Sequence, residues 1–337
     1  MSRLLRWGVL GAAGIARGEV ISAIQGSANG RVLALASRSS ERARELAEAH
    51  GIDRLYATYD SLLADPDVEA VYIPLPNSMH AAWTIRAAEA GKAILCEKPL
   101  ALTEKEATLM VEACVRRRMP LMEGFMYRFH PQNRRVRELI GQGVIGSPRE
   151  VRAHLSVAIM NSVDPSNVRL NPQLGGGALL DMGCYTVNLV RALLGAEPKR
   201  VLAWSDIDAG YRVDVTTAGL LVFPGGKLAS VSCSFLAGGQ GRYSVIGTEG
   251  TIEVPRAVIP GLGTRVAEGL VVIADSDGRR REENFPAVNQ YRIMAEEFAS
   301  SVLTGRPVPY PPEDSLRNMR ALDAMAQSAA SGAAADV

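Results

Sequence analysis

The segment Gly8-Val9-Leu10-Gly11-Ala12-Ala13-Gly14-Ile15-Ala16 decides the fold, because it lies where a first apolar strand must turn into a helix. A glycine-rich turn at such a junction lets backbone N–H groups and the helix N-terminus face a pyrophosphate. Against the pattern G-x-G-x-x-G only Gly11 matches, because Ala13 and Ala16 occupy the other two glycine positions. The motif is weak by itself, so its context has to support it.

The first 120 residues alternate short apolar runs with stretches in which apolar residues recur every three or four positions. Such alternation is typical of βαβ units, whose strands form a doubly wound parallel sheet of the Rossmann type. The glycine-rich turn stands at the first strand–helix junction, so the pattern predicts a dinucleotide-binding domain. We expect strands at Trp7–Leu10, Val32–Ala36, Ala70–Leu75, Ala93–Cys96 and Leu121–Met122, and helices at Ile15–Gln25, Glu41–His50, Met79–Ala90 and Glu104–Arg117.

After Phe125 the pattern changes to a run of strands, several of which are joined by short glycine-containing turns. Tight turns between consecutive strands predict an antiparallel sheet, and the apolar helix Ala178–Leu194 is expected on one of its faces. The expected strands are Val151–Ile159, Val201–Ile207, Val215–Phe223, Leu228–Leu236, Arg242–Gly247, Thr251–Val254, Leu270–Asp275 and Glu282–Phe285.

This change of pattern predicts two domains. Residues 1–124 form the Rossmann domain, and residues 125–330 form an α+β substrate-binding and oligomerisation domain with a large, mostly antiparallel open sheet. Two final helices, Asn289–Leu303 and Pro312–Gln327, can pack back on the first domain. The Ala/Ser-rich residues 331–337 are expected to form a frayed tail.

The composition is that of an ordinary globular protein, with 337 residues, 47% of them hydrophobic and 22% charged. Lysine plus arginine (37) nearly balances aspartate plus glutamate (36), which argues against nucleic acid or an anionic membrane as a partner. Four cysteines show no paired spacing, so we expect a cytoplasmic location and no metal site. No segment approaches the ~20 apolar residues that a membrane span needs.

The end of the second strand bears on the type of dinucleotide. An NAD site usually places Asp or Glu there to bind the ribose hydroxyls, whereas this chain has Ala36-Ser37-Arg38-Ser39-Ser40-Glu41-Arg42. Arg38 and Arg42 suit a 2′-phosphate, and the Ser37 hydroxyl can add a hydrogen bond, so we expect NADP(H) in preference to NAD(H). A simpler interpretation, in which Ser39 or Ser40 caps a helix and the arginines lie on the surface, is compatible with this one.

Two segments are expected at the carboxyl edge of the parallel sheet, where ligands bind in open α/β folds. Cys96-Glu97-Lys98-Pro99 ends the fifth strand, because Pro99 has no N–H to donate, and this places Lys98 at the edge. Leu75-Pro76-Asn77-Ser78-Met79-His80 closes the fourth strand at the same edge, with Asn77 or Ser78 as the cap of the next helix.

A third segment, Gly175–Asn188, is expected to form a helix after three consecutive glycines. Asp181, Tyr185 and Asn188 stand at i, i+4 and i+7, so they share one face of that helix. A polar face on an otherwise apolar helix indicates a functional site. The alternative is a hydrogen-bonded tyrosine at the boundary between the domains.

With these segments in place, the chain resembles the glucose–fructose oxidoreductase, inositol dehydrogenase and rhizopine-catabolism (Gfo/Idh/MocA) family over essentially its whole length. The joint match is specific, although each motif alone is not. It rests on Gly8–Ala16, Asn77–His80, Glu97-Lys98-Pro99, Met122–Pro131 and Gly175–Tyr185, which occur in the order typical of the family.

The chain departs from the commonest form of the family at two positions. Tyr185 stands where many members have a histidine, and Asn188 stands where a further aspartate is common. The chain therefore resembles the tyrosine-bearing branch, which includes glucose–fructose oxidoreductase, dimeric dihydrodiol dehydrogenase and NADP-dependent xylose dehydrogenases. This argues against the oxidation of inositols.

The resemblance also implies binding residues and partners. It places Arg128, Arg169 and Asn188 as substrate contacts, although His130 in the same region can simply cap a helix and Arg128 can bridge the domains. It implies a homodimer or tetramer formed through the sheet around Val215–Leu236. The cofactor contacts that it implies, with the motifs above, are Gly11, Ala13, Gly14, Ile15, Ser37, Arg38, Arg42, Leu75, Pro76, Asn77, His80, Glu97 and Lys98.

The reaction expected of these residues is hydride transfer between nicotinamide C4 and a carbinol or carbonyl carbon. A base must reach the hydroxyl proton, and Tyr185, with an ordinary pKa of about 10, would need its anion stabilised by the Lys98 ammonium. We therefore expect Tyr185 as general acid/base, Lys98 as its electrostatic partner and Asp181 as an orienting group. The reverse assignment, with Lys98 transferring the proton, stays open.

The expected function is an NADP-dependent dehydrogenase or reductase acting on the CH–OH group of a sugar or cyclic polyol. A trans-dihydrodiol dehydrogenase or keto-sugar reductase is the alternative among enzymes. A non-catalytic dinucleotide-binding sensor is the alternative of another class, and the joint presence of Lys98, Asp181 and Tyr185 argues against it.

Overall fold

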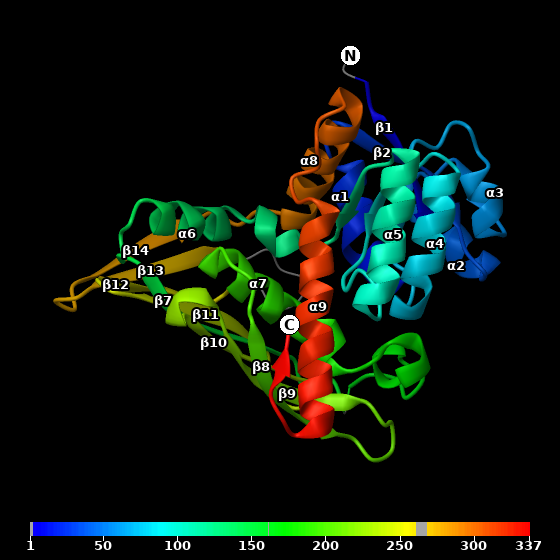
Figure 1. Cartoon of the computed structure of the whole chain (residues 1–337). Helices are drawn as coiled ribbons and strands as arrows, with labels where there is room; N and C mark the ends of the chain where they lie inside the picture. The colour runs from blue at the N-terminus through cyan, green and yellow to red at the C-terminus, as the bar shows by residue number, and fades with distance from the viewer. Residues whose placement is uncertain (1–2, 161, 261–267) are drawn as a thin grey trace. The chain divides into compact units, whose positions relative to one another are not determined.

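The computed structural model describes residues 3–160, 162–260 and 268–337 (Figure 1). The chain divides into two compact units. The first unit consists of Met1–Met126 and Asn289–Leu316, and the second consists of Tyr127–Val288 and Arg317–Val337. Each unit is therefore assembled from two separate stretches of the chain.

The first unit is built on a six-stranded parallel sheet with the strand order β3-β2-β1-β4-β5-β6. Its central strands are buried at almost every position, which requires helices on both faces and explains their continuous apolar sequences. The Rossmann-type sheet expected from the sequence is confirmed. The strands are β1 (Leu5–Leu10), β2 (Gly30–Ala36), β3 (Arg54–Tyr56), β4 (Ala70–Ile73), β5 (Ala93–Cys96) and β6 (Leu121–Glu123).

The helices and strands of this unit differ from the expected pattern in three places. The predicted first helix divides into a π-helical turn, Ala16–Val20, and α1 (Ile21–Gln25). β3 and the short α3 (Tyr59–Leu63) are additional, and β4 ends at Ile73 because the following Pro74 cannot donate to the ladder. The remaining helices are α2 (Ser40–His50), α4 (Asn77–Glu89), α5 (Glu104–Arg117) and α8 (Gln290–Thr304).

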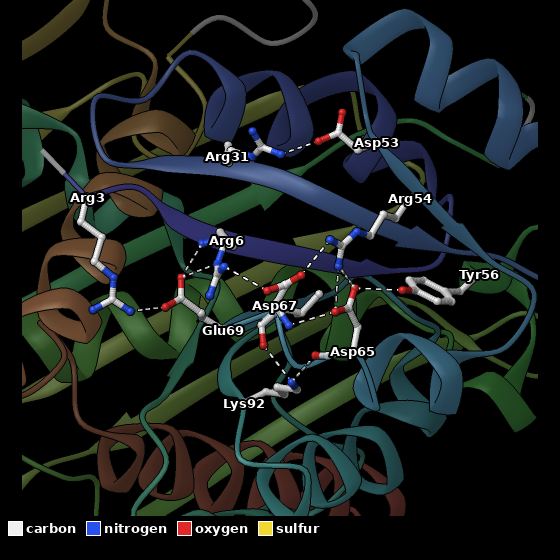
Figure 2. Close-up of polar contacts among 11 residues, drawn as sticks. Arg3, Arg6, Arg31, Asp53, Arg54, Tyr56, Asp65, Asp67, Glu69 and Lys92 are labelled. Carbon is white, nitrogen blue, oxygen red and sulfur yellow. Dashed lines mark hydrogen bonds and ion pairs between the residues drawn. The ribbon is translucent and has the colours of Figure 1, made fainter. Parts of the chain in front are cut away.

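An ion-pair network lies where the strands of this sheet begin (Figure 2). The Arg54 guanidinium lies 2.7 Å from the Asp65 carboxylate and 2.7 Å from the Asp67 carboxylate. Tyr56 donates its hydroxyl to Asp65 over 2.9 Å. Lys92 Nζ, just before β5, donates to the Asp65 carbonyl over 2.7 Å. The network therefore joins the start of β3 to the loop that precedes β4 and to the start of β5.

The second unit contains a nine-stranded sheet with the order β14-β13-β12-β11-β7-β10-β9-β8-β15. All neighbouring strands are antiparallel except β7 and β10, which run parallel, so the expected mostly antiparallel sheet is confirmed. The strands are β7 (Pro148–Ser156), β8 (Arg200–Ile207), β9 (Asp214–Val222), β10 (Leu228–Ser234), β11 (Gln240–Gly247), β12 (Gly250–Val254), β13 (Gly269–Asp275), β14 (Arg280–Phe285) and β15 (Ala335–Asp336).

Helix α7 (Cys184–Leu194) packs on β7 and β10, as expected for the inserted helix. A π-helical turn, Leu179–Gly183, leads directly into it. The other helices are α6 (Pro131–Gly141) and α9 (Pro312–Ser331), the second of which begins in the first unit. None of the described helices combines the length and the apolar character needed to cross a membrane.

The C-terminal tail is ordered, so the prediction that residues 331–337 fray is wrong. The tail forms β15, which pairs antiparallel with β8 through Ala335 and Val201. The buried Ser328 hydroxyl accepts from the Ala203 N–H over 2.9 Å and donates to the Ala333 carbonyl over 2.7 Å. These bonds satisfy backbone groups on both segments, so the small residues of the tail serve close packing.

The ion-pair network generates a prediction about acid stability. Burial alone would raise the pKa of Asp65, but hydrogen bonds from Arg54, the Asp67 N–H and Tyr56 outweigh it and hold that pKa below its ordinary value. A depressed carboxylate pKa adds stability above the unfolded value of about 4 and loses it as pH falls through the folded value. We expect Asp65→Asn to lower the free energy of unfolding by about 1–3 kcal/mol at pH 7.

Urea unfolding of both proteins across pH 2–7 measures this effect, and the difference should shrink toward acid. Asp53→Asn is the matched control, because the Arg31–Asp53 pair is exposed and should contribute little. An equal loss in the two variants, or a difference that does not depend on pH, would contradict the prediction.

Candidate active site

The glycine-rich turn has the geometry of a phosphate-binding turn. Gly11 has a φ of +107°, and its N–H donates to the Ala36 carbonyl over 2.7 Å. Residues with a side chain rarely adopt this φ, so the position favours glycine, and a Cβ there would also lie 3.0 Å from Leu75 Cδ2. At Gly14, by contrast, nothing lies within 4 Å of the Cβ position. The turn thus leaves open space in front of its backbone, which fits the approach of a pyrophosphate.

The end of β2 presents two exposed guanidinium groups. Ser39 is the cap of α2 and accepts from the Arg42 N–H over 3.4 Å, which confirms the capping interpretation. Ser37 Oγ accepts from the Ser39 N–H over 3.2 Å. Arg38 and Arg42 are exposed, and neither side chain has a hydrogen bond or ion pair among the residues that the structure describes. Both guanidinium groups can therefore receive an anion.

The loop between β4 and α4 lies beside the loop that follows β5. The His80 ring is completely buried, with Nδ1 2.9 Å from the Pro99 carbonyl oxygen and Nε2 2.8 Å from the Leu75 carbonyl oxygen. Pro76 occupies the cap position of α4 and Asn77 begins the helix, so the expectation that Asn77 or Ser78 caps it is wrong. The sequence motif Asn77–His80 thus fixes the path of two loops.

Lys98 lies in the second of these loops and is partly exposed. Its N–H donates to the carboxylate of the buried Glu97 over 3.2 Å, and Tyr72 donates its hydroxyl to the same carboxylate over 2.7 Å. The Leu100 N–H donates to the buried Glu123 carboxylate over 2.8 Å. The loop that carries Lys98 is therefore held by its backbone, directly after the carboxyl end of β5.

In the second unit, glycines allow very close packing before the helix that carries Asp181 and Tyr185. A Cβ at Gly176 would lie 2.5 Å from the Arg169 carbonyl oxygen. Gly177 has a φ of +114°, and its Cβ would lie 2.0 Å from Asp214 Oδ1. Neither position can hold a larger residue without movement of its neighbours, which explains the consecutive glycines of the motif.

Asp214 holds the start of this helical segment, and the sequence pattern did not indicate it. Its Oδ2 accepts from the Leu179 N–H over 2.6 Å and from the Thr217 hydroxyl over 2.9 Å, so it caps the start of the helical segment. Burial raises the pKa of this carboxyl, although these hydrogen bonds oppose the shift. Its partner Leu179 lies 35 residues earlier in the chain, and no local pattern links the two.

Asp181 and Tyr185 have distinct environments. Asp181 Oδ2 accepts from Arg169 Nε over 2.8 Å, so the structure brings these two predicted site residues together. The Tyr185 ring is mostly buried and packs edge-on against Tyr127, with the ring centroids 6.0 Å apart. The helix thus presents a fixed carboxylate and a fixed phenol one turn apart.

Three further residues of the predicted motifs lie in other surroundings. Asn188 is buried, and its side-chain oxygen accepts from the Tyr127 hydroxyl over 2.7 Å, so its contact here is internal. Arg128 is partly exposed in the 3₁₀ turn Met126–Phe129. His130 caps α6 by accepting from the Gln132 N–H, and burial lowers its pKa to about 4, which supports the capping interpretation.

Comparison with known proteins identifies the family. Residues 5–125 match the family described as "Oxidoreductase family, NAD-binding Rossmann fold", and residues 133–253 match the GFO/IDH/MocA C-terminal domain. The chain belongs to the Gfo/Idh/MocA oxidoreductase family. It is therefore an NAD(P)-dependent oxidoreductase whose first unit binds the dinucleotide, as the sequence predicts.

Relatives of known activity match this Gfo/Idh/MocA chain over nearly its whole length. It is 36% identical to a D-xylose 1-dehydrogenase (NADP⁺) of Haloferax volcanii over 99% of this chain and 100% of the relative. The solved structure of aldose–aldose oxidoreductase from Caulobacter crescentus, with glycerol, has a TM-score of 0.90 at 30% identity and covers 99% and 100% of the two chains. KijD10, a 3-ketoreductase of Actinomadura kijaniata in complex with NADP and TDP-benzene, has a TM-score of 0.89 at 32% identity and covers 97% and 98%.

Proposed function

We propose that this protein is an NADP(H)-dependent dehydrogenase or reductase that acts on a CH–OH group of a sugar or related cyclic polyol. The observation that carries the proposal is the fixed backbone of the Lys98 loop at the carboxyl edge of the dinucleotide-binding sheet. Relatives that act on xylose, aldoses and a keto-sugar support the substrate class. A bound nicotinamide dinucleotide supplies the hydride donor or acceptor.

The residues assigned to cofactor binding form two groups. Backbone groups of Gly11, Ala13, Gly14 and Ile15 bind the pyrophosphate, and the open space at Gly14 supports this. Ser37, Arg38 and Arg42 bind a 2′-phosphate, which explains the absence of an acidic residue at the end of β2. The loops Leu75–Asn77 and Glu97–Lys98 border the nicotinamide end.

Proton movement is assigned to Tyr185 and Lys98. Tyr185 Oη takes the proton of the substrate hydroxyl in oxidation and returns it in reduction. Lys98 Nζ holds the same substrate oxygen and stabilises the phenolate form. Asp181, held by Arg169, orients a neighbouring substrate hydroxyl. In the competing assignment Lys98 transfers the proton.

We further propose a cytoplasmic homodimer, or a tetramer built from dimers, that pairs through the nine-stranded sheet. Strands β8, β9 and β10 expose apolar side chains, including Trp204 and Leu220, which are 62% and 55% exposed. They border an open groove of about 930 Å³ on the sheet face. An apolar surface of this kind is typical of an interface. The cytoplasmic assignment rests on the four cysteines, all buried and without a disulfide.

Tyr185→Phe and Lys98→Met test the reaction and the division of labour. We expect Tyr185→Phe to lower kcat by about 10²–10⁴-fold, because loss of a general acid/base has this effect. Lys98→Met should lower kcat and shift the limb of the pH profile that reports Tyr185 to higher pH, because the phenolate loses its cationic partner. This is the acidic limb for oxidation and the basic limb for reduction. An NADP(H) absorbance assay over aldoses, inositols, keto-sugars and vicinal diols measures both effects, with Tyr211→Phe as control.

Nearly full kcat in Tyr185→Phe would reverse the assignment. Binding of NADPH without turnover of any substrate in the panel would identify a sensor instead.

Arg38→Ala and Arg42→Ala test the choice of dinucleotide. Each should raise KM for NADPH by about 10-fold or more and leave KM for NADH within about 2-fold, because only NADPH carries the 2′-phosphate. Arg44→Ala on the same helix is the matched control. Equal changes for the two dinucleotides would argue against the assignment.

The double variant Trp204→Glu and Leu220→Glu tests the sheet interface, because two buried carboxylates would oppose pairing. We expect sedimentation velocity to show a monomer, with the folded structure retained by circular dichroism. Leu109→Glu, which changes an exposed apolar residue on α5, should leave the assembly unchanged. A dimer that survives the double change would place the interface elsewhere.

A further inference from the structure

Three buried ionisable side chains hold the Glu97–Lys98 and Pro99–Leu100 peptide groups, one on each side of the Lys98–Pro99 bond. Glu97 accepts from the Lys98 N–H, the His80 ring lies against the Pro99 carbonyl, and Glu123 accepts from the Leu100 N–H. Glu97 follows β5 directly, His80 belongs to α4 and Glu123 ends β6, so two separate elements reach the loop in addition to its own first residue. Hydrogen bonds from buried polar groups to the backbone of a loop restrict its conformation more than packing alone.

His80 differs from the other two because it also contacts a second loop. Its Nε2 lies 2.8 Å from the Leu75 carbonyl oxygen, in the loop between β4 and α4, while Nδ1 lies 2.9 Å from the Pro99 carbonyl oxygen. One imidazole therefore spans the two loops that we assign to the nicotinamide end. The ring has no exposed surface, so it acts on a ligand only through the backbone that it holds.

The chemistry of the two contacts makes them separable. A carbonyl oxygen only accepts, so each contact is a hydrogen bond when the ring nitrogen that faces it carries a proton, and both are hydrogen bonds when the ring is protonated. Burial lowers the pKa of His80, while its contacts with the two carbonyls oppose this shift. A side-chain amide can replace either contact, since Asn places its NH₂ group near the Nδ1 position and Gln places it near the Nε2 position.

We propose that His80 is a positioning residue that couples the Leu75–Asn77 loop to the loop of Lys98. The contact with Pro99 fixes where Lys98 stands relative to the substrate oxygen, and the contact with Leu75 fixes the loop that borders the dinucleotide. This inference rests on the function proposed above for Lys98. Displacement of a catalytic group by about 1 Å can cost about 10²-fold in rate, which gives the backbone contact its importance.

The pair His80→Asn and His80→Gln tests the coupling. We expect His80→Asn to keep kcat within about 3-fold and to weaken NADPH binding by about 10-fold. His80→Gln should do the reverse, with kcat lowered by about 10–100-fold and NADPH affinity kept within about 3-fold. The change in NADPH fluorescence on binding measures the affinity and requires no turnover. The best substrate of the panel is used to measure kcat.

A control variant separates positioning from loss of stability. Phe298→Leu removes one ring of the buried Trp7–Phe298 pair, whose centroids lie 5.2 Å apart, and should lower Tm without changing kcat or NADPH affinity. If kcat and NADPH affinity fall equally in the two His80 variants, or if only their Tm falls, the coupling role is wrong.

Failure of the proposed function has a different signature. If Lys98→Met keeps its activity, the role of Lys98 fails, while the difference in NADPH affinity between the two His80 variants still tests the Leu75 contact. If the two His80 variants then bind NADPH with equal affinity, the inference about His80 is wrong whatever the role of Lys98.

Discussion

At Gly177 the backbone lies so close to Asp214 that a methyl group there would come within 2.0 Å of the carboxylate. The same kind of close approach recurs at Gly176 against the Arg169 carbonyl, and Gly11 has a φ of +107° that a residue with a side chain rarely adopts. In each case the missing side chain permits a backbone path that leads into the candidate site. The rest of the candidate site depends on these approaches, because they set the directions in which the helix of Tyr185 and the phosphate-binding turn begin.

The two edges of the parallel sheet have different electrostatic characters. Where the strands begin, Arg54, Asp65 and their neighbours form paired charges that stabilise the unit and leave little for a ligand. Where the strands end, the ionisable groups His80, Glu97 and Glu123 are buried and hold backbone atoms, while Lys98 stays partly exposed. Ligands bind at carboxyl edges in such sheets, and here the buried groups support the side chains that would meet one.

Local patterns sufficed for the elements that have a continuous apolar run or a clear helical periodicity. The bounds of β5 and α5 match the expectation residue for residue, and the hairpins follow their glycine turns. The pattern could not reveal β3, an edge strand without a buried residue, or the role of Asp214, whose partner is remote in the chain. The composition of residues 331–337 predicted a frayed tail, but these residues pair with β8, where their small side chains allow close packing. His80 was expected at the cofactor site from its motif, but its complete burial is a tertiary property.

The first unit includes α8, which follows the whole of the second unit along the chain. During synthesis on a ribosome, β1 to β6 therefore emerge long before the helix whose Phe298 packs on Trp7. Until nearly 300 residues have been translated, the indole that this helix covers has no partner ring. Domains that emerge first usually fold first, but this one must wait for a distant segment. Completion of the dinucleotide-binding unit is thus tied to translation of the entire sheet-bearing unit that interrupts it.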